Sequence, residues 1–173
     1  CADRYAAEGY AVVLPAMFDR VEPGLSFGYS EFQKGGQTAQ SISEENLCAD
    51  LEAARLSVCD AGKTAIVGYC WGGTVAYIGA SVGNFDAAIS YYGGGIGGLV
   101  ELMQPRVTVM YHFGVTDSFI PESTIEQIRQ ADPISIFHVY EGAGHGFNCD
   151  DRDSYNADAS KLSEKRSLDF LAD

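Results

Sequence analysis

Five short apolar runs recur along the chain, separated by stretches in which apolar residues return with helical spacing. Each run is rich in valine, isoleucine, tyrosine or phenylalanine. A run that is apolar without alternation is typical of a strand buried on both faces of a sheet. The five predicted strands lie at residues 10–15, 64–69, 87–93, 107–114 and 135–141. We therefore expect a mainly parallel sheet.

The segments between these runs predict helices. In the longest, Ile42, Leu47 and Leu51 recur at intervals of four to five residues, which places them roughly on one helical face. The predicted helices lie at residues 37–59, 71–82, 121–132 and 157–173. Strands that alternate with helices imply βαβ units, so we predict an α/β fold with helices on both faces of the sheet.

Three segments predict loops. Residues 16–36 and 142–156 are irregular and contain glycines, and ligand-binding residues commonly lie on such loops at strand ends. The glycine cluster at 91–99 lacks the GxGxxG spacing, so we expect a tight strand-end loop there and no dinucleotide site. Without an internal repeat or linker, residues 1–173 are expected to form a single domain.

Charge and hydropathy narrow the range of partners. The formal net charge is −13, with 24 acidic against 11 basic residues, and an acidic surface repels phosphate backbones. We therefore expect no nucleic-acid partner. No apolar run approaches the roughly 18–20 residues needed to cross a bilayer, so we expect no membrane span. Residues 1–10 are charged and show no apolar core, so no signal peptide is expected there.

The chain holds five cysteines, an odd number, and none lies in a CxxC or Cys/His pair with zinc-like spacing. This pattern gives little support to a disulfide scaffold or a structural zinc site. Free thiols favour a reducing compartment, so we expect a cytoplasmic protein. We expect no metal because the sequence shows no ligand cluster, and no other cofactor because thiolate attack on an acyl carbon needs none. Four of the cysteines are interpreted as small core or surface residues. Cys70 is the exception.

Cys70 lies between a predicted strand and a predicted helix, in the stretch VGYCWGGT. Gly68 and Gly72 flank it, and small residues at these positions would let strand and helix approach closely around a strained turn. Such a turn lifts the cysteine above the sheet at a helix N-terminus, where the helix dipole favours a thiolate. The backbone N–H of Trp71 would then be an oxyanion donor. The alternative is a buried cysteine in a tight turn.

A thiolate nucleophile needs a base, and the base needs an orienting carboxylate. His112 and His138 lie inside predicted strands and are interpreted as packing residues. His145, in the loop GAGHGF, is placed to reach the carboxyl ends of the strands, and Asp117 follows the run 107–114. The order Cys70, Asp117, His145 is the one expected of α/β-hydrolase folds.

These residues and their surroundings resemble the dienelactone hydrolase family, a branch of the α/β-hydrolases with a cysteine nucleophile. The resemblance covers essentially the whole chain, and its matching stretches are EGYAVVLPAMF, DLEAARLSV, VGYCWGGTVAY, YYGGGI, FGVTDSFIP, YEGAGHGFNCD and SLDFLAD. It implies hydrolysis of a small lactone or ester, such as a carboxymethylene butenolide. The roles that it implies are Cys70 as nucleophile, His145 as general base and then acid, and Asp117 as its orienter.

Two departures from the family pattern matter. Residues 1–10 resemble the end of the family's first major helix, so we expect the N-terminal strands, a second oxyanion donor and a glutamate to be absent from this sequence. The family also binds its substrate carboxylate with arginines. One of these positions is Cys149 here, and near the other the chain offers Lys34. Lys34, Tyr69 and Phe147 are the predicted substrate-binding residues.

We therefore predict a carboxylic ester or lactone hydrolase with a Cys-His-Asp triad, acting on a small molecule as a monomer or weak homo-oligomer. Two alternatives remain open. One is a catalytically impaired or non-enzymatic protein on a hydrolase scaffold. The other is a different enzyme with a cysteine elbow, such as an amidotransferase-like protein. The sequence leaves the natural substrate open.

Overall fold

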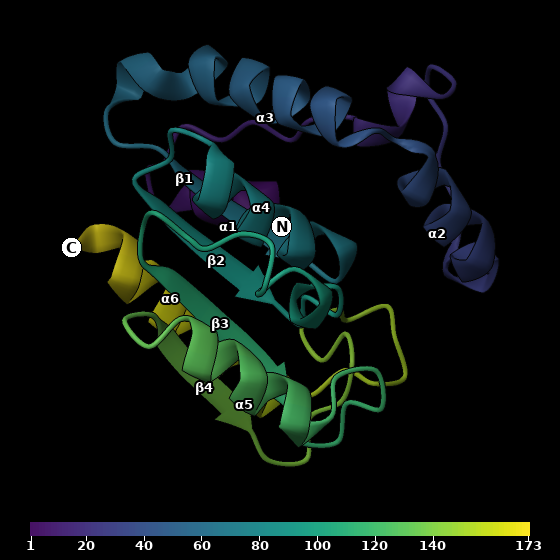
Figure 1. Ribbon diagram of the computed structural model, residues 1–173, viewed down its shortest axis with the longest axis vertical. Coiled ribbons are helices and arrows are strands. Elements are labelled where there is room, and N and C mark those ends of the chain that lie inside the picture. The colour runs from purple at the N-terminus through teal and green to yellow at the C-terminus, as the bar shows by residue number, and fades with distance from the viewer. The chain divides into compact units, whose positions relative to one another are not determined.

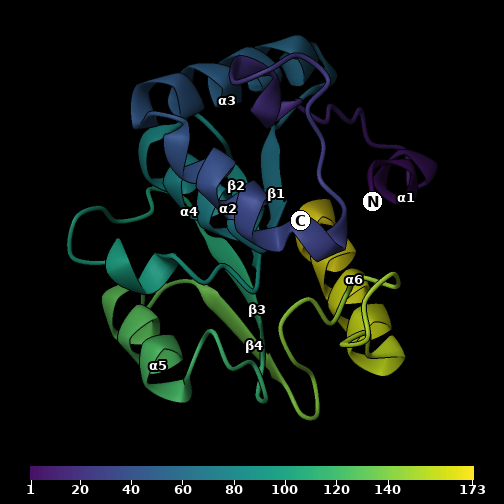
Figure 2. The same ribbon diagram turned by 90° about the vertical axis from the view of Figure 1, so that its right-hand side faces the viewer.

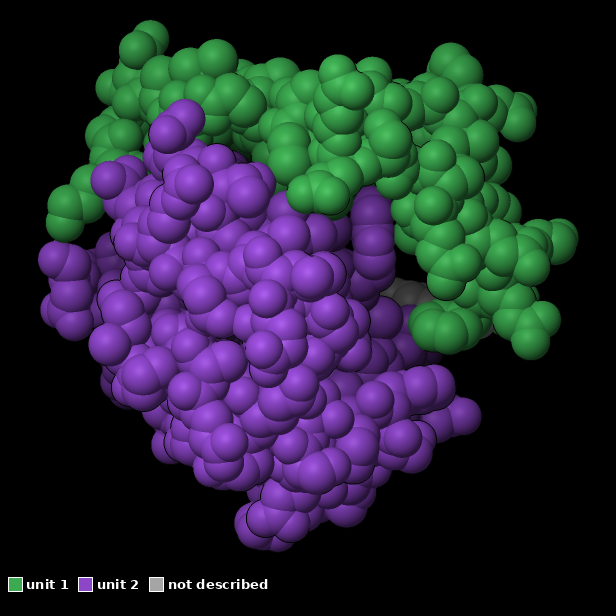
Figure 3. Space-filling model, viewed as in Figure 1, with its two compact units in different colours: residues 1–64 green, residues 65–173 purple. Residues whose placement is uncertain are grey.

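A computed structural model describes residues 1–173, apart from the side chain of Tyr29. The chain separates into two compact units, residues 1–64 and residues 65–173 (Figure 3). The expectation of a single domain over the whole chain stays a prediction. The described helices include none that is both long and apolar enough to cross a bilayer.

The second unit is built on a sheet of four parallel strands, in the spatial order β1-β2-β3-β4 (Figure 1). The strands are Ala65–Tyr69 (β1), Ala87–Tyr91 (β2), Val109–Gly114 (β3) and Ile136–Tyr140 (β4). Four of the five predicted strands are thereby confirmed. Every residue of β3 is buried, as its continuous apolar run predicted.

Three α-helices cover this sheet. They are Trp71–Val82 (α4), Glu122–Ala131 (α5) and Ala157–Ala172 (α6). Figure 2 shows α4 and α5 on one face and α6 on the other, which confirms the prediction of helices on both faces. The segment between β2 and β3 includes a short 3-10 turn, Ile96–Gly98 (η4), and residues 142–156 form a loop, as expected.

Because the strands are parallel, the four segments that follow them all begin at the same edge of the sheet. The carboxyl ends of β1, β2, β3 and β4 lead directly to Cys70, Tyr92, the loop of Asp117 and the loop of His145. The register supports this alignment, because Tyr69 pairs with Tyr91 and Tyr91 pairs with His112. Ligand sites of open parallel sheets lie at this edge.

The first unit is helical. Its elements are Ala2–Ala7 (α1), Met17–Arg20 (η1), Tyr29–Glu31 (η2), Phe32–Ser41 (α2), Glu44–Val58 (α3) and Cys59–Ala61 (η3). The prediction of one helix over 37–59 is wrong, because the chain breaks at Ile42. Ser43 then caps α3, and its hydroxyl accepts a hydrogen bond from the backbone N–H of Asn46 at 3.3 Å.

The predicted strand at residues 10–15 is also wrong, because this segment has no regular structure. Its apolar side chains are partly open to solvent, with Val12 40% exposed and Leu14 79% exposed. A strand is stable only when neighbouring strands satisfy its backbone groups. The described residues of the 1–64 unit include no strand that could pair with it.

Candidate active site

Cys70 occupies a strained turn between β1 and α4. Its backbone angles are φ 57° and ψ −117°, which is rare for a residue with a side chain. Gly68 makes the turn possible, because a Cβ at that position would lie 1.7 Å from the carbonyl oxygen of Gly72. Only glycine fits so close an approach, as the sequence predicted.

The corresponding prediction for Gly72 is wrong. A Cβ at Gly72 would meet nothing within 4 Å. The second close approach falls one residue later, where a Cβ at Gly73 would lie 2.5 Å from the carbonyl oxygen of Tyr91. The first turn of α4 therefore packs on the end of β2 through Gly73. Symmetric glycines around the cysteine suggested Gly72, but the helical turn brings residue 73 to the sheet.

The structure brings Cys70, His145 and Asp117 into one hydrogen-bonded row. The Nε2 atom of His145 lies 3.0 Å from the Sγ atom of Cys70, and its Nδ1 atom lies 2.9 Å from the Oδ2 atom of Asp117. The side chain of His145 is 10% exposed and that of Asp117 is fully buried. The imidazole thus links a thiol to a carboxylate in a site largely withdrawn from water.

Asp117 and His145 come from loops that are fastened to each other. The backbone N–H and the hydroxyl of Thr116 both donate to the carbonyl oxygen of Ala143, each at 2.9 Å. Gly114 allows this contact, since a Cβ there would lie 2.3 Å from the same oxygen. The loops after β3 and β4 therefore hold carboxylate and imidazole in a fixed relation.

The electrostatics favour charge separation between Cys70 and His145. Burial lowers the pKa of His145, but hydrogen bonds to Asp117 and Cys70 outweigh burial and raise the pKa to about 9. Burial raises the pKa of the Cys70 thiol, but the hydrogen bond and charge of His145 outweigh it, and the net shift is downward. A thiol made more acidic beside an imidazole made more basic favours a thiolate–imidazolium pair.

The other predicted site residues have different surroundings. The backbone N–H of Trp71 bonds to the sulfur of Cys70 and helps to lower its pKa. Tyr69, half-buried at the end of β1, stacks on Tyr91 with ring centroids 4.5 Å apart. Phe147 is fully buried, and its role in substrate binding stays a prediction. Lys34 lies in the 1–64 unit and pairs with Glu31 at 2.8 Å.

The two remaining histidines lie in the sheet, as expected. His112 is fully buried, and its ring nitrogens lie 2.8 Å from the Tyr140 hydroxyl and 3.1 Å from the Ser167 hydroxyl. His138 stacks against it with ring centroids 5.5 Å apart. Burial, followed by the charges of His138 and Arg166, holds the pKa of His112 well below its usual range. His112 is therefore a neutral core group.

Sequence reasoning missed three residues near the triad. Tyr92 and Phe119 both contact the ring of His145. The charge of Arg152 helps to lower the pKa of Cys70, and its side chain packs near Gly146, where a Cβ would lie 3.0 Å from the Arg152 Cδ atom. Their positions in the sequence were the available signals: Tyr92 directly precedes Gly93, Phe119 follows Asp117 by two residues, and Arg152 lies in the loop of His145.

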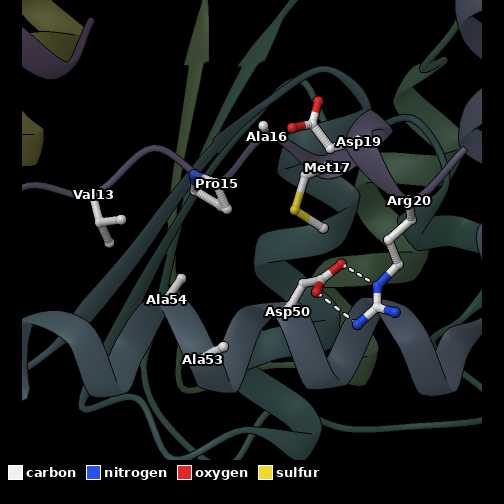
Figure 4. A pocket seen from close by; sticks show the side chains of 9 residues that line it. All are labelled: Val13, Pro15, Ala16, Met17, Asp19, Arg20, Asp50, Ala53 and Ala54. Atoms are coloured by element: carbon white, nitrogen blue, oxygen red, sulfur yellow. Dashed lines mark hydrogen bonds and ion pairs between the residues drawn. The ribbon is translucent and has the colours of Figure 1, made fainter. Parts of the chain in front are cut away.

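The described residues include no group of three or more potential metal ligands. A cavity of about 360 Å³ in the 1–64 unit is mostly apolar, with one ion pair, Arg20–Asp50, in its wall (Figure 4). Both guanidinium–carboxylate bonds of that pair are made within the wall, at 2.7 and 2.8 Å. The cavity contains no member of the triad.

Solved structures identify the class of fold. The chain is similar to MGS-M1, an α/β-hydrolase enzyme from a deep-sea metagenome library, with a TM-score of 0.57, 17% identity, and coverage of 96% of this chain and 73% of that one. A Klebsiella pneumoniae protein, crystallised and provisionally assigned as a dienelactone hydrolase, matches with a TM-score of 0.82 and 26% identity over 98% of this chain and 78% of that chain. The fold is that of the α/β-hydrolases.

Sequence comparison then gives the family. The model of the dienelactone hydrolase family matches residues 1–173. The chain is also 34% identical to the carboxymethylenebutenolidases of Pseudomonas putida and Pseudomonas knackmussii, over 95% of this chain and 75% of each relative. The chain therefore belongs to the dienelactone hydrolase family, and the predictions of that family and of a hydrolase are confirmed.

Proposed function

We propose that this protein hydrolyses a small lactone or carboxylic ester through Cys70, His145 and Asp117, by way of an acyl-enzyme. The observation that carries the proposal is the row of two hydrogen bonds, 3.0 Å from His145 to Cys70 and 2.9 Å from His145 to Asp117. Membership of the dienelactone hydrolase family and the name of the Pseudomonas relatives support an ester or lactone as the substrate.

In the first half of the proposed reaction, the Cys70 thiolate attacks the carbonyl carbon of the substrate. A C–S bond forms, and the carbonyl oxygen takes the negative charge. The N–H of Trp71 follows Cys70 at the start of α4 and is proposed as a donor to that oxyanion. When the tetrahedral intermediate collapses, the C–O bond breaks, and His145 gives its proton to the departing alkoxide.

In the second half, water replaces the leaving group. His145, now neutral, takes a proton from water, and the hydroxide adds to the acyl carbon of the thioester. Collapse of this second intermediate breaks the C–S bond and releases the carboxylic acid, while the sulfur leaves as a thiolate beside the imidazolium. Asp117 holds the Nδ1 side of the imidazole through both halves and stabilises its positive charge. These steps consume water and require no further reactant.

The proposal is tested by hydrolysis of a short-chain aryl ester and of a dienelactone. We expect the wild-type chain and Cys149→Ala to hydrolyse at least one of them, and Cys70→Ala to lose that activity. Cys149 is the matched control because it is a half-buried cysteine in the loop of His145. Equal rates of hydrolysis in Cys70→Ala and wild type would show that Cys70 is not the nucleophile. No hydrolysis by the wild-type chain would favour the alternative of an impaired scaffold.

Thiol labelling gives a second test that needs no substrate. A thiolate reacts with iodoacetamide much faster than a thiol. Cys70 should therefore be alkylated near neutral pH well before Cys59, whose Sγ donates a hydrogen bond to the carbonyl oxygen of Leu56. If Cys70 and Cys59 react at the same rate in the folded protein, Cys70 is not an activated nucleophile. The cytoplasmic location and the monomeric or weakly oligomeric state stay predictions.

A further inference from the structure

Two aromatic rings contact the imidazole of His145 in addition to its hydrogen-bonded partners. The centroid of the Tyr92 ring lies 5.2 Å from that of the imidazole, with 60° between the ring planes. The Phe119 ring lies 5.0 Å away at 65°. Both are edge-to-face contacts, a geometry that aromatic pairs favour. Tyr92 and Phe119 are called the aromatic bracket below.

The two hydrogen bonds of His145 leave one motion of its ring poorly restrained. They meet the ring at Nδ1 and Nε2, so the imidazole can tilt about the line joining these atoms while both distances change little. The two N–H bonds of an imidazolium are not collinear, so this tilt swings them away from their acceptors. Hydrogen bonds weaken steeply as they bend. Rings packed against the imidazole oppose such a tilt.

Tyr92 shows that the fold tolerates strain at this position. Its φ is +40°, and Cys70 is the only other described residue besides glycine with a positive φ. Residues keep such conformations only where their surroundings determine them, and they gather at functional sites. The N–H of Tyr92 donates to the carbonyl oxygen of His112 at 2.8 Å, and the residue is 3% exposed. The strained backbone therefore carries a fixed ring beside His145.

Phe119 acts on two members of the triad. Its backbone N–H donates to the Oδ1 atom of Asp117 at 2.9 Å, while the Oδ2 atom faces His145. Its ring contacts the imidazole although 64% of the residue is exposed. An exposed aromatic ring gains little from burial at this position, so its contact with His145 is the feature to explain.

We propose that Tyr92 and Phe119 are positioning residues, which hold the imidazole of His145 in line with Cys70 and Asp117. The aligned imidazole keeps the Cys70–His145 pair ionised and ready for acyl transfer. This inference rests on the proposed function, because the alignment of His145 affects catalysis only if Cys70 is the nucleophile. Phe119 is the better probe of the two, since its exposure allows substitution with little loss of packing.

The test is the rate of Cys70 alkylation by iodoacetamide between pH 5 and pH 10, followed by peptide mass spectrometry in wild type and in Phe119→Ala. Without the ring, the thiolate loses part of its stabilisation, and we expect alkylation at pH 6 to slow by about three- to tenfold. Toward pH 10 the thiol of the variant also ionises, and the two rates should converge.

Two variants serve as controls. Phe119→Tyr keeps an aromatic ring and should restore the wild-type profile. Val115→Ala removes an apolar side chain of similar exposure, 49%, from the same loop and should leave the profile unchanged. For an ester that the wild type hydrolyses, Phe119→Ala should lower kcat by a similar factor and leave KM nearly unchanged, because the ring acts on His145.

The outcomes separate this inference from the proposed function. If wild-type Cys70 reacts no faster than Cys59, the proposed function fails, and the bracket has no role to play. If wild-type Cys70 reacts fast and Phe119→Ala matches it at every pH, the proposed positioning role of the aromatic bracket is wrong. The proposal that Cys70 is the nucleophile is then unaffected. A slowing of equal size at all pH values would also contradict the positioning role, because that result would reflect access to the sulfur.

Discussion

His145 and His112 belong to the same unit, and each has both ring nitrogens within hydrogen-bonding distance of a partner, but their pKa values move in opposite directions. His145, in the loop after β4, lies between a carboxylate and a thiol, and its pKa rises to about 9. His112, within β3, lies between the hydroxyls of Tyr140 and Ser167, and its pKa falls well below 6.5.

The difference follows from what the partners can do for a charge. A carboxylate compensates an imidazolium, and a thiol can become the second anion. A hydroxyl can donate or accept but supplies no net charge, and the neighbours His138 and Arg166 make a positive charge on His112 still less favourable. Full satisfaction of hydrogen bonds therefore does not distinguish a histidine with a raised pKa from one with a lowered pKa. The charge of the partners does.

The largest effect should come from His145→Gln. Glutamine can fill the space and keep a hydrogen bond, but it can neither accept the thiol proton nor return it. We expect hydrolysis to fall by about 10²–10⁴, the usual contribution of a general acid–base group. Circular dichroism should show a folded protein, and urea unfolding should show a lower free energy of unfolding than in wild type, because the buried Asp117 carboxylate loses its charged partner. Hydrolysis within a few-fold of wild type would show that His145 is not the base.

The same substitution at His112 should move stability and leave the chemistry intact. His112→Gln loses the ring stack on Tyr91, whose centroid lies 4.3 Å away, and misaligns two buried hydrogen bonds. We expect the free energy of unfolding, measured in urea, to fall by about 2–3 kcal/mol. Cys70 alkylation in the folded variant should stay near the wild-type rate. A large fall in the rate of Cys70 alkylation with unchanged stability would contradict the structural role of His112 and show that it acts on Cys70.

Much of the second unit could be predicted from the sequence because its signals are local. Runs such as VTVMYHFG are apolar without alternation, and a strand buried on both faces is what such runs form. The candidate triad could be located because Cys70, Asp117 and His145 each follow a strand of a parallel sheet, so topology alone brings them to one edge. Their distances then depend on packing between the loops.

The features that the sequence did not reveal are those that depend on distant partners. The run at 10–15 has strand-like composition, but pairing decides whether a strand forms. Phe147 follows His145 closely in sequence, yet its ring packs 5.3 Å from Tyr92 and 5.1 Å from Tyr140, inside the core. The bracket contacts of Tyr92 and Phe119 depend on a backbone angle and on loop packing, which no spacing in the sequence encodes.

Acid should reveal the contribution of His112 to stability. Because the folded pKa of His112 lies below its unfolded value of about 6.5, the unfolded chain binds the proton first. The stabilising contribution is present above pH 6.5 and is lost as the pH falls. Urea unfolding from pH 7 to pH 5 should show a slope of up to about 1.4 kcal/mol per pH unit from this group. In His112→Gln the part of the slope due to His112 should be absent. The part due to His138, whose pKa is also lowered, should remain. Parallel curves for the two proteins would mean that His112 is not the titrating group.

The effect of pH on stability has the opposite sign for His145. Its folded pKa of about 9 lies above the unfolded value, so its contribution to stability is complete below about pH 6.5 and is lost as the pH rises through about 9. Below about pH 6, the pH dependence of stability in His145→Gln should accordingly match that of wild type. The two variants therefore separate an acid-sensitive core group from an alkali-sensitive site group within one unit.

The smallest effect tests whether the hydroxyl partners of His112 matter individually. The Ser167 hydroxyl, fully buried on α6, lies 3.1 Å from the Nε2 atom of His112 and 2.7 Å from the Tyr91 hydroxyl. Ser167→Ala leaves both groups short of a partner and should lower the free energy of unfolding by about 1–2 kcal/mol.

Ser163→Ala is the matched control. This residue is equally buried on the same helix, but its hydroxyl donates to the carbonyl oxygen of Ser160, one turn away. It should cost less, because a helix carbonyl keeps its other bonds. Equal losses in the two variants would show that the link from α6 to His112 adds nothing beyond an ordinary buried serine, and the stability of that region would then rest on the ring stacks alone.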